Sequence, residues 1–294
     1  MRILFTGATS LAGRRLCARL GAHGHEVVAV SRQPLAGPGA SVQVDLEADD
    51  AAARLPDGPF DALVHFASFV PQDERASRWE ECYARNVVPA ARLLEWAAGR
   101  VRRVLLASSC AVYGAAKLAT PTTEEHPLRP DTAYALSKYA QEQLFAAFCR
   151  TQGVPLVTLR LGYVVGPGMP AARAVVAFID MVRAGRPITL ANPHSAGLHL
   201  VHQDDIAAIG EALLTEGEGA YNLASPRHIS LFEYVETVMQ VLDRRVEITV
   251  REDRGAPVTN HYCCRRLLER HGLAPRVTLA DAIRSLADAR EVTP

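Results

Sequence analysis

The amino-acid sequence predicts an α/β fold, built on a doubly wound parallel sheet and completed by a smaller C-terminal lobe. Two features predict it. Short runs rich in Val, Leu and Ile alternate with stretches of helical periodicity over the first half of the chain, which is the pattern of a parallel sheet with crossover helices. Beyond residue 160, glycine and proline break the chain into shorter elements.

The expected strands show little alternation of polar and apolar side chains, as strands buried on both faces do. They span residues 3–6, 27–30, 42–44, 62–66, 104–107 and 156–161. Helical periodicity between them predicts helices over residues 11–22, 79–98 and 132–151. We therefore expect one sheet domain over residues 1–160.

The second half of the chain, residues 161–294, is expected to form mainly the smaller lobe, with some segments returning to the sheet domain. Helical periodicity reappears there over residues 205–214, 231–242 and 265–271. The sequence contains no internal repeat and no linker long enough to separate independent domains.

Composition excludes several classes of protein. The 294 residues carry 32 Lys+Arg and 32 Asp+Glu, and this balance gives a nucleic-acid partner no electrostatic support. No apolar run reaches the length of a membrane span, and the N-terminus enters a strand rather than a leader, so we expect a cytoplasmic protein without membrane contact. The six cysteines form no CxxC pair, which is typical of reduced thiols.

A glycine turn joins the first expected strand to the first expected helix, where residues 6–13 read TGATSLAG. Glycine permits the close approach of a pyrophosphate, and the helix N-terminus offers it free N–H groups. The turn therefore predicts a Rossmann-type dinucleotide site, and a purely structural turn is the alternative. The residues expected to bind the dinucleotide here are Gly7, Thr9, Ser10, Leu11 and Gly13.

The end of the second expected strand indicates which dinucleotide binds. It reads Ser31-Arg32 and offers no carboxylate to a free 2′-hydroxyl of the adenosine ribose. An arginine there pairs instead with a 2′-phosphate, so these two residues favour NADP over NAD. The alternative is that Arg32 is a solvated loop residue.

A tyrosine and a lysine four residues apart, Tyr134 and Lys138, lie on one expected helix. Residues at this spacing share a helix face, so the phenol and the ammonium can point into one cleft. A nearby ammonium is expected to lower the pKa of the tyrosine and make it a usable acid or base. The chain has only two lysines, Lys117 and Lys138, which makes a chance pairing with tyrosine rare.

A serine pair, Ser108-Ser109, directly follows the expected strand 104–107. Ligands of open parallel sheets gather at the carboxyl ends of the strands, where a hydroxyl can orient a reacting oxygen. Alone, two serines in a loop are more often turn residues.

Together these residues resemble the extended short-chain dehydrogenase/reductase superfamily, in its NAD-dependent epimerase/dehydratase branch, over nearly the whole chain. Residues 6–13 are similar to that family's TGxxGxxG turn, although Ser10 stands where the middle glycine is usual. Asp45-Leu46 matches the family's adenine-contacting aspartate, and residues 65–68 (HFAS) are similar to its loop beside the cofactor. The resemblance thus adds to the cofactor site Asp45, Leu46, Phe66, Ala67 and Ser68.

The resemblance continues through the second half of the chain. Asn86 fits the family's structural asparagine, and counting back from residues 113–114 (YG) places its catalytic serine or threonine on Ser109. Tyr134 and Lys138 match its acid/base and its ribose-binding lysine. Residues 160–168 (RLGYVVGPG) are similar to its RxxNVYGPG segment, which places Tyr163 beside both cofactor and substrate, and residues 202–205 (HQDD) are similar to its HVDD.

Departures from the family pattern narrow the function. Tyr163 replaces the usual asparagine, and Leu198 stands where many nucleotide-sugar enzymes place a diphosphate-binding arginine. Both weaken the case for a nucleotide-sugar substrate without excluding it, because Arg173, Arg183 or Arg186 could take that role. Cys110-Ala111 stand where 4,6-dehydratases of this family carry an acidic pair, which argues against a dehydratase. Cys110 is also similar to the cysteine of a GDP-fucose synthase-like Ser-Ser-Cys sequence, one position out of register.

Three histidines, His194, His199 and His202, lie within nine positions of one another. Metal sites use such clusters, but the chemistry inferred here needs no metal, so we expect none.

The leading prediction is an NADP-dependent ketoreductase that acts on a keto-sugar or a nucleotide-linked keto-sugar. Ser109, Tyr134 and Lys138 are the expected catalytic residues, and the expected substrate contacts are Ser109, Cys110, Tyr134 and Tyr163. An NAD-dependent sugar epimerase that passes through a transient ketone uses the same three catalytic residues and is the alternative. A non-catalytic dinucleotide sensor is the alternative of another class. The resemblance also implies a homodimer that packs through the helix carrying Tyr134.

Overall fold

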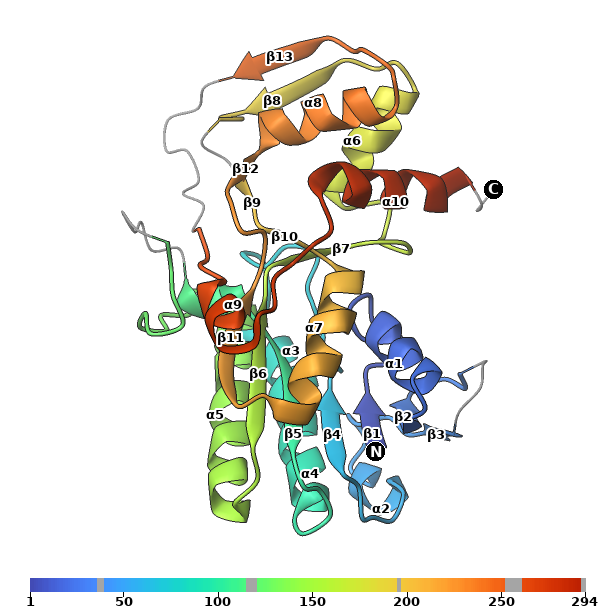
Figure 1. Cartoon of the computed structure of the whole chain (residues 1–294), viewed down its shortest axis with the longest axis vertical. Helices are drawn as coiled ribbons and strands as arrows, with labels where there is room; N and C mark the ends of the chain where they lie inside the picture. Colours follow the sequence, from blue (N-terminus) through green and yellow to red (C-terminus); the bar gives the residue numbers. More distant parts are fainter. Residues whose placement is uncertain (36–39, 115–120, 195–196, 252–260, 292–294) are drawn as a thin grey trace.

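The computed structural model describes residues 1–35, 40–114, 121–194, 197–251 and 261–291 (Figure 1). Their centre is a seven-stranded sheet in the order β11-β6-β5-β4-β1-β2-β3, in which every neighbouring pair is parallel. Its strands are β1 (Arg2–Thr6), β2 (Glu26–Ser31), β3 (Ala40–Gln43), β4 (Ala62–His65), β5 (Val104–Ser109), β6 (Leu156–Leu161) and β11 (Gly219–Leu223). The predicted doubly wound α/β fold is confirmed.

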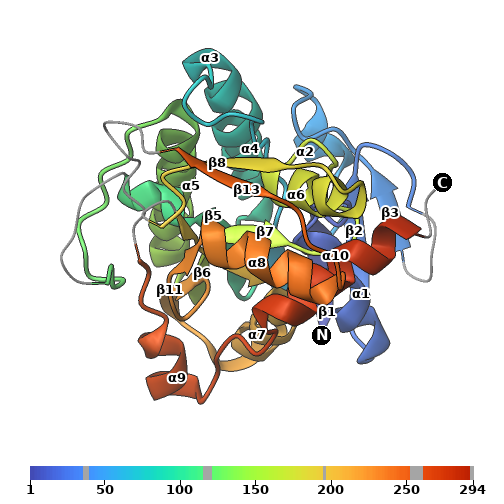
Figure 2. The same ribbon diagram turned by 90° about the horizontal axis from the view of Figure 1, so that it is seen from above.

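Helices cover both faces of this sheet (Figures 1 and 2). They are α1 (Gly13–Ala22), α2 (Ala51–Arg54), α4 (Val88–Ala97), α5 (Ala133–Gln152) and α7 (Gln203–Glu216). Successive residues of β1 point to opposite faces, so Phe5 packs in the core beneath α1 and α7, whereas Leu4 packs in the core beneath α4 and α5. Both faces of the strand are therefore buried, which explains why the strand sequences show little alternation of polar and apolar residues.

The smaller lobe stands beyond the carboxyl ends of the strands (Figure 1). It contains α6 (Ala174–Arg183), α8 (Leu231–Val241) and α10 (Leu279–Glu291), and the parallel pair β8 (Ile188–Ala191) and β13 (Ile248–Arg251). Its core includes Ile179, Ile188, Val235 and Ile283. Short strands connect it to the sheet domain, namely β7 (Tyr163–Val165), β9 (Gly197–Leu198), β10 (Leu200–His202) and β12 (Ile229–Ser230).

Local chemistry sets the ends of α5, the helix that carries Tyr134 and Lys138. At its start, Thr132 accepts a hydrogen bond from the backbone N–H of Ala135 at 3.1 Å, which satisfies one of the free amides of the first turn. At its end, Gly153 adopts a left-handed conformation with φ +66°, as a C-terminal capping glycine does. The helix therefore begins just ahead of Tyr134.

The structure differs from the expected elements in a few places. The expected helix 79–98 is α3 (Trp79–Cys82), a π-helical turn η1 (Tyr83–Val87) and α4. The third strand begins at Ala40, because the sheet register pairs Val28 with that residue. Helices α2, α6 and α10 were not expected, whereas α9 (Arg265–His271) was.

One segment of the second half, β11, lies at the edge of the sheet beside β6. The division at residue 160 stays a prediction. No described helix combines the length and apolarity needed to cross a membrane.

Candidate active site

The glycine turn after β1 packs closely against the loop that follows β4. Gly7 has φ +80°, and a Cβ atom there would lie 2.3 Å from the backbone nitrogen of Ala67. A Cβ atom on Gly13 would lie 2.3 Å from the carbonyl oxygen of Gly7. Both positions therefore require glycine, Gly7 for its backbone conformation as well as for space.

Ser10, the residue that replaces the family's middle glycine, has a local role. Its Oγ accepts a hydrogen bond from the backbone N–H of Gly13 at 2.9 Å. This caps the start of α1, because the first N–H groups of a helix have no acceptor within the helix. Ser10 thereby holds the glycine turn against the first turn of α1.

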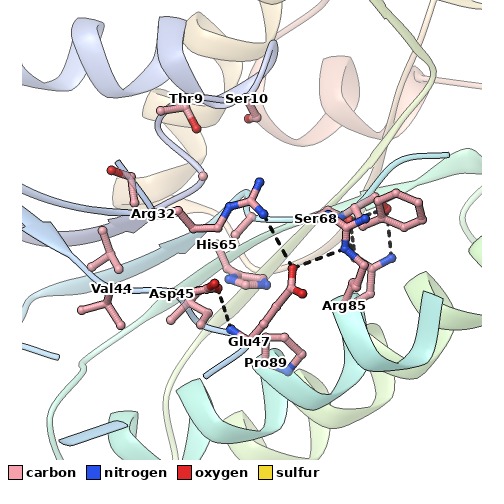
Figure 3. Close-up of a pocket in the computed structure, with 17 residues that line it drawn as sticks. Thr9, Ser10, Arg32, Val44, Asp45, Glu47, His65, Ser68, Arg85 and Pro89 are labelled. Atoms are coloured by element: carbon pink, nitrogen blue, oxygen red, sulfur yellow. Dashed lines mark hydrogen bonds and ion pairs between the residues drawn. The ribbon is translucent and has the colours of Figure 1, made fainter. Parts of the chain in front are cut away.

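A cavity of about 260 Å³ opens beside this turn, at the carboxyl ends of β1, β2 and β4 (Figure 3). It brings together most of the residues predicted to bind the cofactor. The predicted residues that line it are Gly7, Thr9, Ser10, Ser31, Arg32, Asp45, Leu46, Ala67 and Ser68. Gly13 lies just behind the turn, outside the lining.

The tertiary structure brings a carboxylate to Arg32 that the end of the second strand does not itself supply. Oε1 of Glu47 lies 4.0 Å from Nη1 of Arg32 and 3.4 Å from Nε of Arg85, and all three side chains line the first cavity (Figure 3). The Ser31-Arg32 end of β2 by itself favours NADP, whereas Glu47 adds a negative charge beside Arg32 that opposes a 2′-phosphate. Glu47 lies in the segment after β3. Neither the glycine turn nor the end of β2 includes it, so those two motifs gave no signal for it.

A second cavity, of about 530 Å³, lies between the sheet and the smaller lobe. Ser10 and Ser68 line both cavities, so the two adjoin. The predicted residues that line the second cavity are Ser10, Leu11, Phe66, Ser68, Ser109, Cys110, Tyr134, Lys138 and Tyr163. All of the residues predicted to be catalytic thus face one space.

Tyr134 and Ser109 both line the second cavity. The Ser109 side chain accepts a hydrogen bond from the backbone N–H of Ala111 at 3.1 Å. Burial raises the pKa of Tyr134 above its usual value and the charge of Glu74 raises it further, whereas the Ser109 side chain opposes this shift. The phenol is therefore harder to ionise than that of an exposed tyrosine.

The Lys138 side chain is tied by hydrogen bonds to β5 and to its own helix, α5. Its Nζ donates to the carbonyl oxygen of Ala107 at 2.8 Å and to Oε1 of Gln141 at 2.6 Å, and it lies 3.5 Å from Oγ of Ser68. Burial lowers the pKa of Lys138 to about 7. Burial, followed by the charge of Glu74, raises the pKa of Tyr134, and the lowering expected from Lys138 stays a prediction.

Asn86 ties the cofactor loop to α5. Its Oδ1 accepts from the backbone N–H of Phe69 at 2.7 Å, and its Nδ2 donates to Oγ of Ser137 at 2.9 Å. Asn86 lies in the π-helical turn η1. Such turns often occur at functional sites, and this one directs the amide between two elements.

The two remaining predicted substrate contacts have different surroundings. Cys110 is buried, and its Sγ donates to the carbonyl oxygen of Arg160 at 3.1 Å. Burial raises the pKa of the Cys110 thiol well above its usual value, so this thiol is unsuited to act as a base at neutral pH. Tyr163, at the start of β7, lines the second cavity and has its pKa raised by burial.

Several polar residues that the sequence analysis did not assign also line the second cavity. They are Ser108, Glu74, Arg173, His199 and Tyr262. Ser108 is buried and its hydroxyl has no hydrogen-bond partner among the described residues. The sequence indicated Ser108 by its place beside Ser109, and Arg173 as a candidate to bind a diphosphate, whereas Glu74 lies outside any motif.

The three clustered histidines separate in the structure. The His199 ring lies 6.2 Å from that of His261, and Nε2 of His202 lies 3.0 Å from Oγ of Ser285. The side chain of His194 lies against Phe232 instead, with 4.9 Å between their ring centroids.

Two buried histidines near the site predict a loss of stability in acid. Burial, then Lys138, lowers the pKa of His65 to about 3, and burial, then the neighbouring His228 and His261, lowers that of His199 to about 4. In the unfolded chain both titrate near 6.5. Below pH 6.5 the unfolded chain binds more protons, so the free energy of unfolding should fall by about 1.4 kcal/mol per pH unit for each histidine.

Denaturant unfolding at pH 7 and pH 5 measures this slope. His65→Gln should make it shallower, and the matched change of the exposed His194, His194→Gln, should leave it as in the wild type. Equal slopes in the wild type and His65→Gln would contradict the assignment of a neutral buried imidazole.

Known proteins share both this sequence pattern and this fold. The sequence model of the NAD dependent epimerase/dehydratase family matches residues 3–224. The chain is 29% identical over its whole length to the dTDP-6-deoxy-L-talose 4-dehydrogenase (NAD(P)(+)) of Kitasatospora kifunensis, covering 96% of that protein. It is 24% identical, over 78% of its length, to a trifunctional UDP-glucose 4,6-dehydratase/UDP-4-keto-6-deoxy-D-glucose 3,5-epimerase/UDP-4-keto-L-rhamnose-reductase of Arabidopsis thaliana. It spans only 35% of the length of that plant protein.

Solved structures show the same architecture. MoeE5 in complex with UDP-glucuronic acid and NAD superposes with a TM-score of 0.86 at 23% identity, covering 100% of both chains. RMD from Pseudomonas aeruginosa complexed with NADPH gives a TM-score of 0.83 at 23% identity, covering 99% of both chains. At these identities the likeness establishes the fold.

Proposed function

The chain belongs to the NAD dependent epimerase/dehydratase family and is an NAD(P)-dependent enzyme, and we propose that it is a ketoreductase that reduces a nucleotide-linked keto-sugar with NADPH. The observation that carries this proposal is the convergence of Ser109, Tyr134 and Lys138 on the second cavity, which adjoins the cavity lined by Arg32. Tyr134 can serve there as the acid that a reduction needs, and Arg32 favours the NADPH that a net reduction consumes.

The proposed roles follow from the contacts of each side chain. The Ser109 hydroxyl donates to the keto oxygen and orients it towards Tyr134. NADPH, when bound, would supply the hydride for the carbonyl carbon, and Tyr134 would give its phenolic proton to the keto oxygen. Lys138, which already bonds Gln141 and the Ala107 carbonyl, donates to the ribose hydroxyls of the cofactor.

The residues present fit a dinucleotide in an extended pose. The first cavity carries Arg32 and the glycine turn, and it meets the second cavity at Ser10 and Ser68. The adenosine end would occupy the first cavity and the nicotinamide end the second. We propose accordingly that residues 1–160 bind the cofactor and that residues 161–294 mainly bind the substrate.

Two relatives support a keto-sugar substrate, because their names describe interconversion of an alcohol and a ketone on a nucleotide sugar. The test incubates the protein with dTDP-6-deoxy-L-talose and NADP⁺ or NAD⁺, and in the reverse direction with a UDP-linked 4-keto-6-deoxy-sugar and NADPH. A ketoreductase forms one oxidised nucleotide for each alcohol produced. Sugar interconversion with no net change in nucleotide would make the epimerase the correct function instead.

The proposed preference for NADP(H) depends on Arg32. Arg32→Ala removes a guanidinium beside the expected 2′-phosphate, so the dissociation constant of NADPH should rise about tenfold or more while that of NADH changes little. Titrations of both nucleotides into nucleotide-free protein measure this. Arg102→Ala is the control, because Arg102 is exposed just before β5, at the opposite ends of the strands. Equal losses of affinity for NADPH and NADH would contradict the proposed preference for NADP(H).

A further inference from the structure

One carboxylate in the first cavity is shared between two guanidinium groups. Oε1 of Glu47 lies between Arg32 and Arg85, at 4.0 Å and 3.4 Å respectively (Figure 3). The backbone of Glu47 is fixed on both sides: its N–H donates to Oδ1 of Asp45 at 3.0 Å, and its carbonyl oxygen accepts from Nη1 of Arg92 at 2.6 Å. The backbone of Glu47 is therefore fixed beside the cavity, and its carboxylate reaches both guanidinium groups.

Arg85 is the better anchored of the two cations. Its guanidinium carbon lies 4.0 Å from the centre of the Phe69 ring, and its Nη1 bonds Glu81 at 3.3 Å. The Arg85 side chain is 29% exposed, whereas that of Arg32 is 64% exposed. A preorganised guanidinium loses less freedom when it binds an anion, so Arg85 is well placed to hold a phosphate.

We propose that Glu47 and Arg85, together with Arg32, set the choice of this cavity between NADP(H) and NAD(H), an inference that rests on the proposed function. A 2′-phosphate carries nearly two negative charges at neutral pH and meets two guanidiniums there, but it must displace the Glu47 carboxylate from both. A free 2′-hydroxyl is uncharged and can donate a hydrogen bond to that carboxylate. Glu47 therefore opposes NADP(H) and supports NAD(H), and Arg85 does the reverse.

A phosphate can replace the Glu47 carboxylate beside the two arginines because the site is partly exposed. Glu47 is 39% exposed, and ion pairs at such sites contribute little net free energy. A phosphate with a higher charge can therefore replace the carboxylate as partner of the two arginines. The carboxylate then stays close to the phosphate, and its repulsion lowers the affinity for NADP(H).

The test compares NADPH and NADH titrations of the nucleotide-free full chain for four proteins. Glu47→Gln should tighten NADPH about five- to tenfold, because it removes one negative charge at close range, and should leave NADH unchanged or weaken it slightly. Arg85→Met keeps an apolar stem on Phe69 and should weaken NADPH about tenfold relative to NADH. Glu81→Gln is the matched control: it alters the other carboxylate on Arg85, which does not line the cavity, and the ratio should stay that of the wild type.

An unchanged or lower NADPH affinity in Glu47→Gln overturns the inference, and so does a shift of the ratio in Glu81→Gln as large as that in Glu47→Gln. Thermal unfolding of each variant checks that the fold is retained. Nucleotide binding is measured independently of turnover. A wild-type protein that binds nucleotide but reduces no keto-sugar therefore contradicts the proposed function alone. A wild type that binds neither nucleotide contradicts both.

Discussion

Tyr134→Phe should reduce turnover by about a hundred- to ten-thousand-fold, the contribution typical of a positioned acid. The change removes only the hydroxyl and leaves the aromatic ring in its buried place. Because the adenosine end of the cofactor would lie in the first cavity, which Tyr134 does not line, nucleotide affinity should stay within about threefold of the wild type. Single-turnover kinetics and nucleotide titration measure the two quantities separately.

Tyr139→Phe is the matched control for this prediction. Tyr139 lies on the same helix and packs against the cluster around Tyr113, away from the cavity wall formed by Tyr134. Its turnover should resemble that of the wild type. Retained activity in Tyr134→Phe on a true substrate would remove Tyr134 from the mechanism and favour a different proton donor in the cavity.

The second large effect is expected from the buried ion pair between Arg160 and Glu142. Nη2 of Arg160 lies 2.9 Å from Oε2 of Glu142 and its Nε lies 3.1 Å from Oε1, and both side chains are less than one tenth exposed. Nη1 of Arg160 also donates to the hydroxyl of Tyr113 at 2.7 Å. The pair thus joins β6, α5 and the turn after Ser109.

Glu142→Leu should lower the free energy of unfolding by about 3–5 kcal/mol, because it leaves the buried guanidinium without its counter-charge. The double variant Glu142→Leu/Arg160→Met should recover part of this loss, since it removes both charges. Denaturant unfolding measures both. The control is Glu269→Leu, which breaks the exposed pair with Arg265 and should cost about 1 kcal/mol or less. A double variant less stable than the single would show that the charge pair is not the dominant interaction.

Much of the fold was predictable because each element carries a local signal. Strand β6 and helix α9 have the expected bounds, and α5 lies within one residue of its expected start and end. The π-helical turn within the expected helix 79–98 was not predictable, because the helical spacing of apolar residues continues across it. Helix α6 was missed because it follows the Gly-Pro break at residues 166–168, which reads as a loop.

The candidate site was predictable where its residues lie next to a strand end or on one helix face. Ser109, Tyr134 and Lys138 were found in this way, and all three line the second cavity. Glu47 and Arg85 were not, because they come from two segments with no shared spacing. Their proximity depends on how the loop after β3 meets η1, which no local pattern records.

By itself the sequence determined the α/β fold class, the place of the glycine turn, and the residue types of the Ser109, Tyr134 and Lys138 set, since these depend on local propensity and short spacings. The tertiary structure decided the electrostatics. The raised pKa of Tyr134, the lowered pKa of Lys138 and the carboxylate that faces Arg32 all depend on burial and on neighbours distant in the chain. Desolvation and Coulomb interaction act through space, so their balance exists only once the chain has folded.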